Sequence, residues 1–321
     1  MAARVSGLLF RAASLYYARR DALAIFIYHR VLPRPDPVLG DEVDSALFRQ
    51  HLAFLRKNFN VLPLTEAVGR LRQGSLPARA ACITFDDGYA DNSTVALPLL
   101  REFDLPATFF IATGYLDGGR MWNDTIIEAI RNARSPLLLD GYGQFNLKTE
   151  RNRHAAAMGI IATLKFLPFG ERQQRAEQIA NMTGTALPDN LMMTRAEVRA
   201  LHAAGMTVGA HTEMHPILSR TDIARAREEI VRGREQLETI IGEPVRVFAY
   251  PNGRPVRDYG TVHVDLVKKL GFEAAVSTAW GVARQNSDPY QLPRFTPWDR
   301  GEFKFAARLI QNYRRGPEVR V

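Results

Sequence analysis

The chain has a single cysteine, Cys82, among its 321 residues. One cysteine excludes an intramolecular disulfide and is compatible with a reducing compartment. Cys82 lies in the short apolar run 81–83, so we interpret it as a small buried side chain. The sequence also has no internal repeat and no low-complexity segment, which argues against repeat and fibrous architectures.

Long uninterrupted apolar runs are missing at the N-terminus as well. Apolar residues in 1–22 recur at helical spacing, but Arg11 interrupts them and Arg4, Arg19 and Arg20 surround them. Such a segment is too short and too charged for a signal peptide core or a membrane span. We expect residues 1–22 to form a basic amphipathic segment that packs on the domain or makes peripheral contact with a membrane. This favours a cytoplasmic location or the surface of the inner membrane.

Acidic residues are fewer than basic ones, and the net charge is +8. A basic surface can attract nucleic acid, anionic lipid or acidic glycan. No zinc-finger spacing and no basic motif interleaved with aromatic residues accompanies this charge, so we expect no nucleic-acid partner. A solvated basic surface is the simplest interpretation, and the oligomeric state is left open.

Short apolar runs alternate with helical patterns along most of the chain. The runs are rich in Ile, Val, Phe and Tyr, as expected for parallel strands that are buried on both faces. The expected strands are 23–29, 81–85, 107–113, 207–211, 246–250, 273–278 and 291–295. The expected helices between them include 45–59, capped by Ser45, and 194–204, which opens with a Thr194 and Glu197 capping box. This alternation predicts an α/β fold with a parallel sheet.

Residues 114–190 break the alternation. This region has helical patterns at 122–133, 152–166 and 171–182 and no convincing strand. We predict a helical insertion after the third strand, either a cap over the active site or a packing element. The expected division is therefore a barrel domain at 23–300 that contains this insertion, followed by a C-terminal helix and basic tail at 301–321.

Two polar motifs stand at the ends of predicted strands. The first is Thr84-Phe85-Asp86-Asp87-Gly88-Tyr89, and the second is His211-Thr212-Glu213-Met214-His215. Because adjacent strand residues point to opposite faces, the two aspartates can do different work, one binding a metal and one moving a proton. Two imidazoles and one carboxylate form a common catalytic metal site. Each motif by itself is also compatible with an ordinary turn or with surface histidines.

The chain resembles the NodB-type polysaccharide deacetylases, carbohydrate esterase family 4, from about residue 23 to 298. The two motifs above match the family's first and second motifs, and Phe248-Ala249-Tyr250-Pro251-Asn252-Gly253 lies where the third is expected. The resemblance implies a distorted (β/α)7 barrel, which agrees with the seven predicted strands. It further implies one divalent metal ion held by Asp87, His211 and His215, with Asp86 as the catalytic base. Zinc is the first choice, with cobalt, nickel, iron or manganese as alternatives.

The sequence departs from the usual family pattern in three places. One is the Asp-rich Trp motif, which is not apparent, and the other two are catalytic positions, so the usual general acid is missing. An arginine that steadies the catalytic aspartate is replaced by Ala249, and the usual Leu-x-His reads Leu292-Pro293-Arg294. These departures resemble the branch that includes poly-N-acetylglucosamine deacetylases, which has an early Tyr-His on the first strand. We therefore expect His29 to be the general acid. We expect Arg294 to form an ion pair with Asp86 in place of the missing arginine.

Four further residues are expected to contact the substrate or its oxyanion. They are Asn252, Tyr250, Tyr89 and Trp122. A backbone N–H near Asn252 could stabilise the oxyanion. Trp122 and Trp298 could each stack on a sugar ring or simply pack.

The resemblance implies a metal-dependent hydrolase that removes N-acetyl groups from N-acetylhexosamine units. The substrate would be a cell-surface polysaccharide, an exopolysaccharide for example, or its lipid-linked precursor. A deformylase acting on a lipid-linked amino sugar is the alternative enzyme. A non-catalytic glycan-binding barrel is the alternative from another class, and the departures at Ala249 and Arg294 are its only support.

Overall fold

The computed structural model describes residues 22–40, 42–314 and 320–321. Its central sheet is built from parallel strands in the order β1, β3, β4, β7, β8 and β9. These strands are Ala22–Tyr28 (β1), Ala80–Phe85 (β3), Thr108–Ile111 (β4), Thr207–Ala210 (β7), Val247–Ala249 (β8) and Ala274–Val276 (β9). Every residue of β1 and β3 is buried, as the apolar runs predict. Six of the seven expected strands are therefore confirmed.

The seventh expected strand, 291–295, closes the sheet without forming a continuous strand. Leu292 makes a parallel bridge to Val276 on one side, and Phe295 makes a parallel bridge to Phe26 on the other. The N–H of Phe295 donates to the carbonyl of Ile25 at 2.8 Å. The segment thus joins β9 to β1, and the result is the distorted (β/α)7 barrel that the sequence predicts.

Two short strands were not expected. Asn60–Val61 (β2) pairs in parallel with the start of β3, and Ala283–Arg284 (β10) pairs antiparallel with the start of β1. Each has two residues, which is too short to produce a recognisable hydrophobic pattern.

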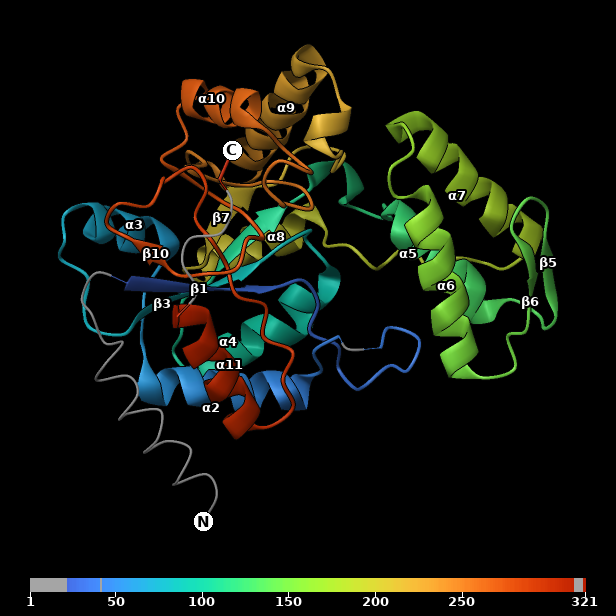
Figure 1. Cartoon of the computed structure of the whole chain (residues 1–321), viewed down its shortest axis with the longest axis horizontal. Helices are drawn as coiled ribbons and strands as arrows, with labels where there is room; N and C mark the ends of the chain where they lie inside the picture. Colours follow the sequence, from blue (N-terminus) through green and yellow to red (C-terminus); the bar gives the residue numbers. More distant parts are fainter. Residues whose placement is uncertain (1–21, 41, 315–319) are drawn as a thin grey trace.

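Helices surround the barrel (Figure 1). They are Ser45–Asn58 (α2), Leu64–Arg72 (α3), Leu97–Glu102 (α4), Arg195–Ala203 (α8), Ile223–Ile241 (α9), Thr261–Lys269 (α10) and Glu302–Arg314 (α11). The capping box of α8 is confirmed, with Thr194 accepting from the N–H of Glu197. The expected cap of α2 is wrong by one residue, because Asp44 and not Ser45 accepts the N–H of Leu47.

The helical insertion after β4 is confirmed and lies to one side of the barrel (Figure 1). It consists of Trp122–Asn132 (α5), Glu150–Leu164 (α6) and Phe169–Thr183 (α7). It also holds a hairpin that sequence analysis missed, Leu137–Leu139 (β5) with Gly143–Phe145 (β6). The insertion has its own apolar cluster, which includes Ile126, Ile130 and Ile160. Three-residue strands are too short to compete with the helical pattern around them.

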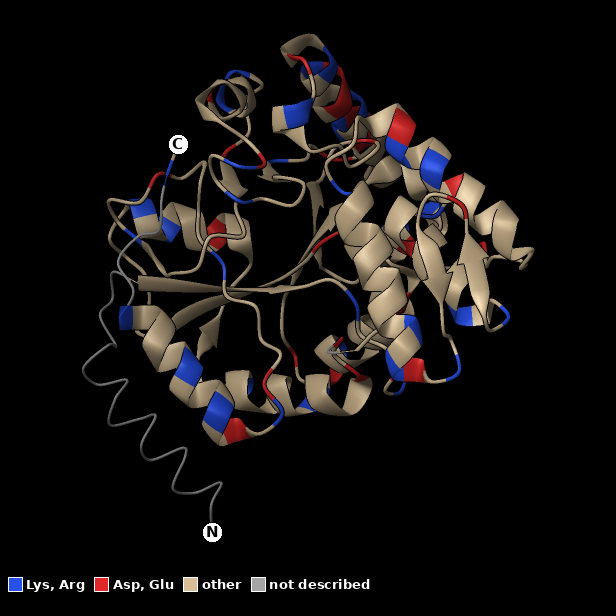
Figure 2. Cartoon of the chain, turned by 45° about the vertical axis from the view of Figure 1, so that its right-hand side comes forward, with Lys and Arg blue, Asp and Glu red and all other residues tan. Residues whose placement is uncertain are grey.

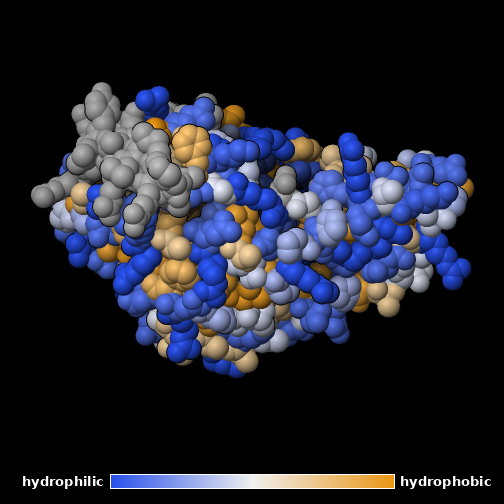
Figure 3. All heavy atoms as spheres, turned by 90° about the horizontal axis from the view of Figure 1, so that it is seen from below, coloured by the Kyte–Doolittle hydropathy of each residue, from blue (hydrophilic) through white to orange (hydrophobic). Residues whose placement is uncertain are grey.

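The surface is mixed in charge (Figure 2) and in hydropathy (Figure 3). Lys and Arg are spread over several helices together with Asp and Glu (Figure 2), and the face seen from below mixes hydrophilic residues with small apolar areas (Figure 3).

Cys82 is fully buried, as expected. No helix among residues 22–40 and 42–314 is long and apolar enough to cross a bilayer. The basic amphipathic segment expected at 1–22 lies almost entirely outside the described residues, and the division into domains stays a prediction.

Candidate metal centre and active site

A cavity of about 220 Å³ opens where the parallel strands end at their carboxyl side. Residues that follow different strands meet here, because parallel strands place their carboxyl ends at the same end of a barrel. Seven residues singled out from the sequence line it: His29, Asp86, Asp87, Trp122, His211, His215 and Asn252. Asn123, which follows Trp122, lines it too.

The Asp-Asp motif leaves β3 through a sharp turn. Asp86 continues the strand, with its N–H donating to the carbonyl of Tyr28 at 2.9 Å. Asp87 then adopts a φ of 77°, and Gly88 a φ of 93°. A left-handed conformation is rare for a residue with a side chain and is concentrated at functional sites. The turn brings both carboxylates to one cavity, which strand alternation alone would not do.

A tight loop after β7 carries both histidines. Thr212 and His215 also have positive φ values, 65° and 51°. The hydroxyl of Thr212 accepts the N–H of His215 at 3.0 Å, which closes the loop. Nδ1 of His211 lies 2.8 Å from the carbonyl oxygen of Ala249, so this nitrogen is the donor and Nε2 keeps its lone pair. His211 is therefore set to present Nε2 to the cavity, which His215 also lines.

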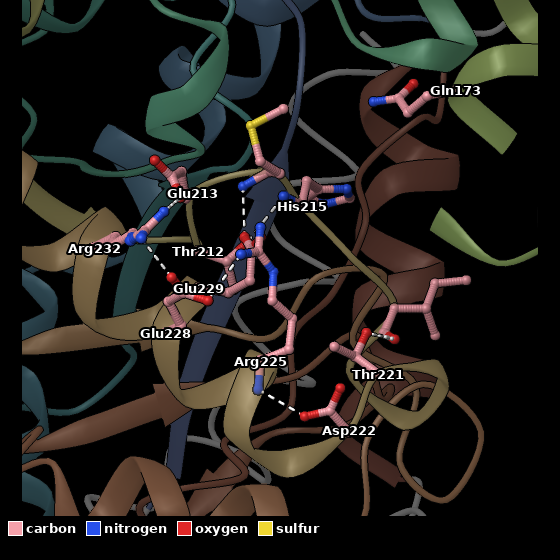
Figure 4. A network of polar contacts seen from close by, with 12 residues as sticks. Gln173, Thr212, Glu213, His215, Thr221, Asp222, Arg225, Glu228, Glu229 and Arg232 are labelled. Carbon is pink, nitrogen blue, oxygen red and sulfur yellow. Dashed lines mark hydrogen bonds and ion pairs between the residues drawn. The ribbon is translucent and has the colours of Figure 1, made fainter. Parts of the chain in front are cut away.

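Helix α9 supports this loop from behind (Figure 4). The buried carboxylate of Glu229 accepts the N–H of Met214 at 2.7 Å and pairs with Arg225 at 2.8 Å. Arg232 pairs with Glu213, the middle residue of the motif, at 3.8 Å. Gly233 allows the helix to approach the loop, because a Cβ there would lie 2.5 Å from the backbone of Thr212.

Asp87, His211 and His215 form a candidate metal site. One carboxylate oxygen of Asp87 lies 3.4 Å from Nε2 of His211 and 3.4 Å from Nε2 of His215. Ligands bound tetrahedrally at about 2.0–2.2 Å from an ion would be separated by roughly 3.3–3.6 Å. The residues thus fit a divalent first-row ion with an open coordination position. Burial opposes ionisation of Asp87, but His211 and His215 outweigh it and hold its pKa well below the usual range.

The expected ion pair between Asp86 and Arg294 is present. Both guanidinium Nη atoms donate to the carboxylate oxygens, each at 2.6 Å, and both side chains are buried. Nε of Arg294 donates to the carbonyl of Ser277 at 2.8 Å, which fixes the plane of the guanidinium. Burial by itself would raise the pKa of Asp86, but the charge of Arg294 lowers it below the ordinary value. Asp86 is therefore kept ionised next to the metal site.

His29 lies at the end of β1 and lines two cavities. One is the cavity of the metal site, and the other, of about 420 Å³, also contains Glu42 and Trp298. The backbone around His29 is held firmly, since Asn92 donates to its carbonyl at 2.9 Å and Arg30 pairs with Asp91 at 2.8 Å. This placement is compatible with a general acid at the rim of the site.

Two residues expected at the substrate lie elsewhere. Tyr250 is completely buried and stacks on Tyr259 with ring centroids 3.9 Å apart. Tyr89 is buried as well, and its hydroxyl donates to Asp124 at 3.1 Å. Neither side chain lines the cavity. Tyr89 and Tyr250 are close in sequence to residues that line the cavity. The turn after β3 and the direction of β8 nevertheless point the two rings into the core.

Sequence reasoning missed two charged residues of the cavity wall, Lys165 and Arg172. Both come from the insertion, Lys165 from the end of α6 and Arg172 from the first turns of α7. They stand among many exposed charged residues of the same helices, so no local pattern distinguishes them. Only the packing of the insertion against the barrel brings them to the site.

Comparison with known proteins agrees with this arrangement. The polysaccharide deacetylase family model matches residues 73–275. The poly-β-1,6-N-acetyl-D-glucosamine N-deacetylase of Escherichia coli is 24% identical over 279 residues, 86% of this chain and 37% of that protein. YxkH, a Bacillus subtilis protein named for polysaccharide deacetylation, is 19% identical over 249 residues. The chain thus spans 37% and 62% of the lengths of these two relatives.

Solved structures share the fold. The deacetylase PplD of Streptococcus pyogenes, in complex with acetate, superposes with a TM-score of 0.60 at 18% identity, covering 92% of this chain and 99% of that chain. IcaB from Ammonifex degensii gives 0.58 at 20% identity, covering 91% and 97%. The family model covers more than half of the sequence, and the barrel and its motifs agree with it. The chain therefore belongs to the polysaccharide deacetylase family.

Proposed function

We propose that this protein is a metal-dependent N-deacetylase acting on N-acetylhexosamine units of a polysaccharide. One observation carries the proposal. A three-ligand metal set, Asp87, His211 and His215, shares a cavity with Asp86, a carboxylate kept ionised by Arg294. A non-catalytic glycan-binding barrel would not require a buried ionised carboxylate beside a metal site, since such a group is costly to keep.

The residues divide the work of amide hydrolysis as follows. Asp87, His211 and His215 would hold the ion, which when bound lowers the pKa of water and polarises the acetamide carbonyl. Asp86 accepts the proton of the attacking water, and Arg294 holds its carboxylate in position. The N–H of Asn252, in the turn after β8, is the proposed donor to the oxyanion.

The leaving amine must be protonated before the carbon–nitrogen bond breaks. His29 is the proposed acid, because an imidazole donates a proton readily near neutral pH and this one lines the same cavity. Arg294 cannot take that role, because a guanidinium keeps its proton. It is in any case fully engaged with Asp86 and the carbonyl of Ser277.

The substrate class is inferred from the cavity and the relatives. Trp122 and Asn123 line the cavity and provide an aromatic side chain and an amide for contact with a sugar. The Escherichia coli relative is named for poly-β-1,6-N-acetyl-D-glucosamine, which supports an N-acetylhexosamine polymer of the cell surface or its lipid-linked precursor.

The test combines metal content with acetate release. Purified protein is analysed by mass spectrometry for bound metal and is then assayed on β-1,6-linked N-acetylglucosamine oligomers. We expect about one ion per chain, lost in Asp87→Ala and kept in Asp86→Asn, with acetate release lost in both. Wild-type turnover in Asp86→Asn would refute the proposed base, and absence of bound metal after reconstitution would refute the hydrolase.

A further inference from the structure

Arg172 is a buried cation in the wall of the catalytic cavity. Only 2% of its surface is exposed, and neither Nε nor Nη2 has a hydrogen-bond partner. The remaining nitrogen, Nη1, makes a long contact of 3.3 Å with the carbonyl of Lys165. Donors of a buried arginine are normally satisfied, because an unpaired buried donor is costly.

The surroundings of Arg172 do not supply a counter-charge. Its guanidinium lies over the rings of Trp122 and Phe169, at 4.9 Å and 5.6 Å from their centroids. Within the part of the chain that the structure describes, no carboxylate forms an ion pair with it. An uncharged side chain in place of Arg172 could pack α7 on α5 equally well. A buried charge lowers the stability of the folded protein, because it loses its hydration. The arrangement therefore points to an anion that arrives with the substrate.

The charge balance of the cavity leads to the same conclusion. Asp86 is neutralised by Arg294, and Asp87 belongs to the metal site, so no carboxylate of the wall remains for Lys165 and Arg172. Burial lowers the pKa of Lys165, and the positive charges of Arg257 and Arg172 add to this effect. Asp258 opposes it, but lies outside the cavity wall.

We propose that the insertion provides an anion subsite at Arg172 and Lys165, and that the preferred substrate is an N-acetylhexosamine carrying a phosphoryl group. A guanidinium binds phosphate through paired N–H donors, and an ammonium adds a point charge, so the two suit a phosphoryl group better than a single carboxylate. This rests on the proposed deacetylase function and names its substrate class. The phosphoryl group is shared by soluble sugar phosphates and by lipid-linked sugars.

Binding to chelator-treated protein tests the subsite without deacetylation. Intrinsic tryptophan fluorescence, to which Trp122 beside Arg172 contributes together with Trp280 and Trp298, is titrated with N-acetylglucosamine, N-acetylglucosamine 1-phosphate and N-acetylmuramic acid at constant ionic strength. We expect the phosphate to bind about 10- to 100-fold more tightly than the neutral sugar, as for a charge-assisted hydrogen-bonded pair. Equal affinity for phosphate and neutral sugar would overturn the proposal, and tighter binding of the carboxylate would overturn the choice of a phosphoryl group.

Matched variants locate the effect. Arg172→Gln should abolish the preference for phosphate and Arg172→Lys should keep part of it, whereas Arg175→Gln, an exposed change one turn along α7, should behave as wild type. If Arg172→Gln fails to fold, Lys165→Gln, on a half-buried residue, should still weaken phosphate binding severalfold. Unchanged phosphate binding in folded Arg172→Gln or in Lys165→Gln would refute the subsite.

Two further measurements separate the possible outcomes. The affinity for N-acetylglucosamine 1-phosphate is compared with the affinity for its farnesyl phosphodiester, which distinguishes a soluble from a lipid-linked source of the phosphoryl group. Tighter binding of either compound than of the neutral sugar supports the subsite. Acetate release from neutral oligomers by Arg172→Gln is measured in parallel. If the wild type releases acetate but shows no preference for the sugar phosphate, only the subsite is refuted. If the wild type binds the sugar phosphate but holds no metal and releases no acetate, only the deacetylase function is refuted.

Discussion

The contact between α9 and the histidine loop predicts that a single methyl group at Gly233 will impair the metal site. An ideal Cβ at this position would lie 2.5 Å from the carbonyl carbon and oxygen of Thr212, and 3.0 Å from the nitrogen of Glu213. These are backbone atoms, so no change of rotamer can relieve the clash. In Gly233→Ala the helix and the loop must move apart, and the loop carries His211 at one end and His215 at the other.

Stability and metal affinity should respond differently to this change. Alanine in place of glycine favours a helix by about 1 kcal/mol, whereas overpacking costs about 1–3 kcal/mol. The two effects partly cancel, and we expect a net loss of about 0–2 kcal/mol in the free energy of unfolding. Metal ligands tolerate displacements of only about 0.5 Å, and weakened support typically lowers metal affinity about 10- to 100-fold.

Zinc affinity is measured by competition with a chromophoric chelator, and stability by urea unfolding in excess chelator. Gly159→Ala is the matched control, because Gly159 is an exposed residue of α6 whose added Cβ would meet no atom within 4 Å. The control should gain up to about 1 kcal/mol and bind zinc normally. Zinc binding of wild-type strength in Gly233→Ala would refute the idea that this close contact positions the ligands.

Three further predictions concern buried ionisable side chains and the metal site. Arg294→Met leaves the Asp86 carboxylate buried without a partner and should cost about 3–5 kcal/mol in urea unfolding at pH 8. Adding Asp86→Asn to Arg294→Met should restore most of the lost free energy of unfolding. If the effects of the two single substitutions on this free energy simply add in the double variant, Asp86 and Arg294 are not a coupled pair. Burial lowers the pKa of His51 from 6.5 to about 4. The unfolded chain therefore binds more protons between these values, and stability should fall by up to about 3 kcal/mol as pH drops from 6.5 to 4. The fall of stability with decreasing pH should be smaller in His51→Gln than in the wild type. It should be unchanged in His202→Gln, because His202 is partly exposed. An equal pH dependence of stability in all three proteins would refute the assignment of this effect to His51. Zinc at about 100 times its Kd should stabilise the wild type by about 2.7 kcal/mol and Asp87→Ala not at all. Equal thermal shifts in both proteins would place the ion elsewhere.

Much of the fold was predictable because it depends on local patterns. Parallel strands buried on both faces are continuous apolar runs, and β1 and β3 were found within one residue of their observed limits. The capping box of Thr194 and Glu197 was likewise local. Elements of two or three residues, such as β2, β10 and the hairpin of the insertion, were missed because their pairing partners alone define them.

The candidate site was predictable only in its chemistry. The residue types of Asp87, His211 and His215 indicate metal ligands, and the family resemblance led to the expected pairing of Arg294 with Asp86. Neighbourhood in sequence was a poor guide to exposure, however. Tyr250 stands two residues before Asn252, yet its ring is in the core while Asn252 lines the cavity.

The sequence by itself therefore determined the barrel, the ends of its strands and the kind of ligands placed there, because side-chain chemistry and hydrophobic period are properties of the chain. Only the tertiary structure decided which distant residues complete the site. Arg172 reaches the cavity because the insertion packs against the barrel, and Gly233 matters because a helix crosses behind the histidine loop. Such contacts join segments far apart in the chain, and their energies depend on packing that no local pattern encodes.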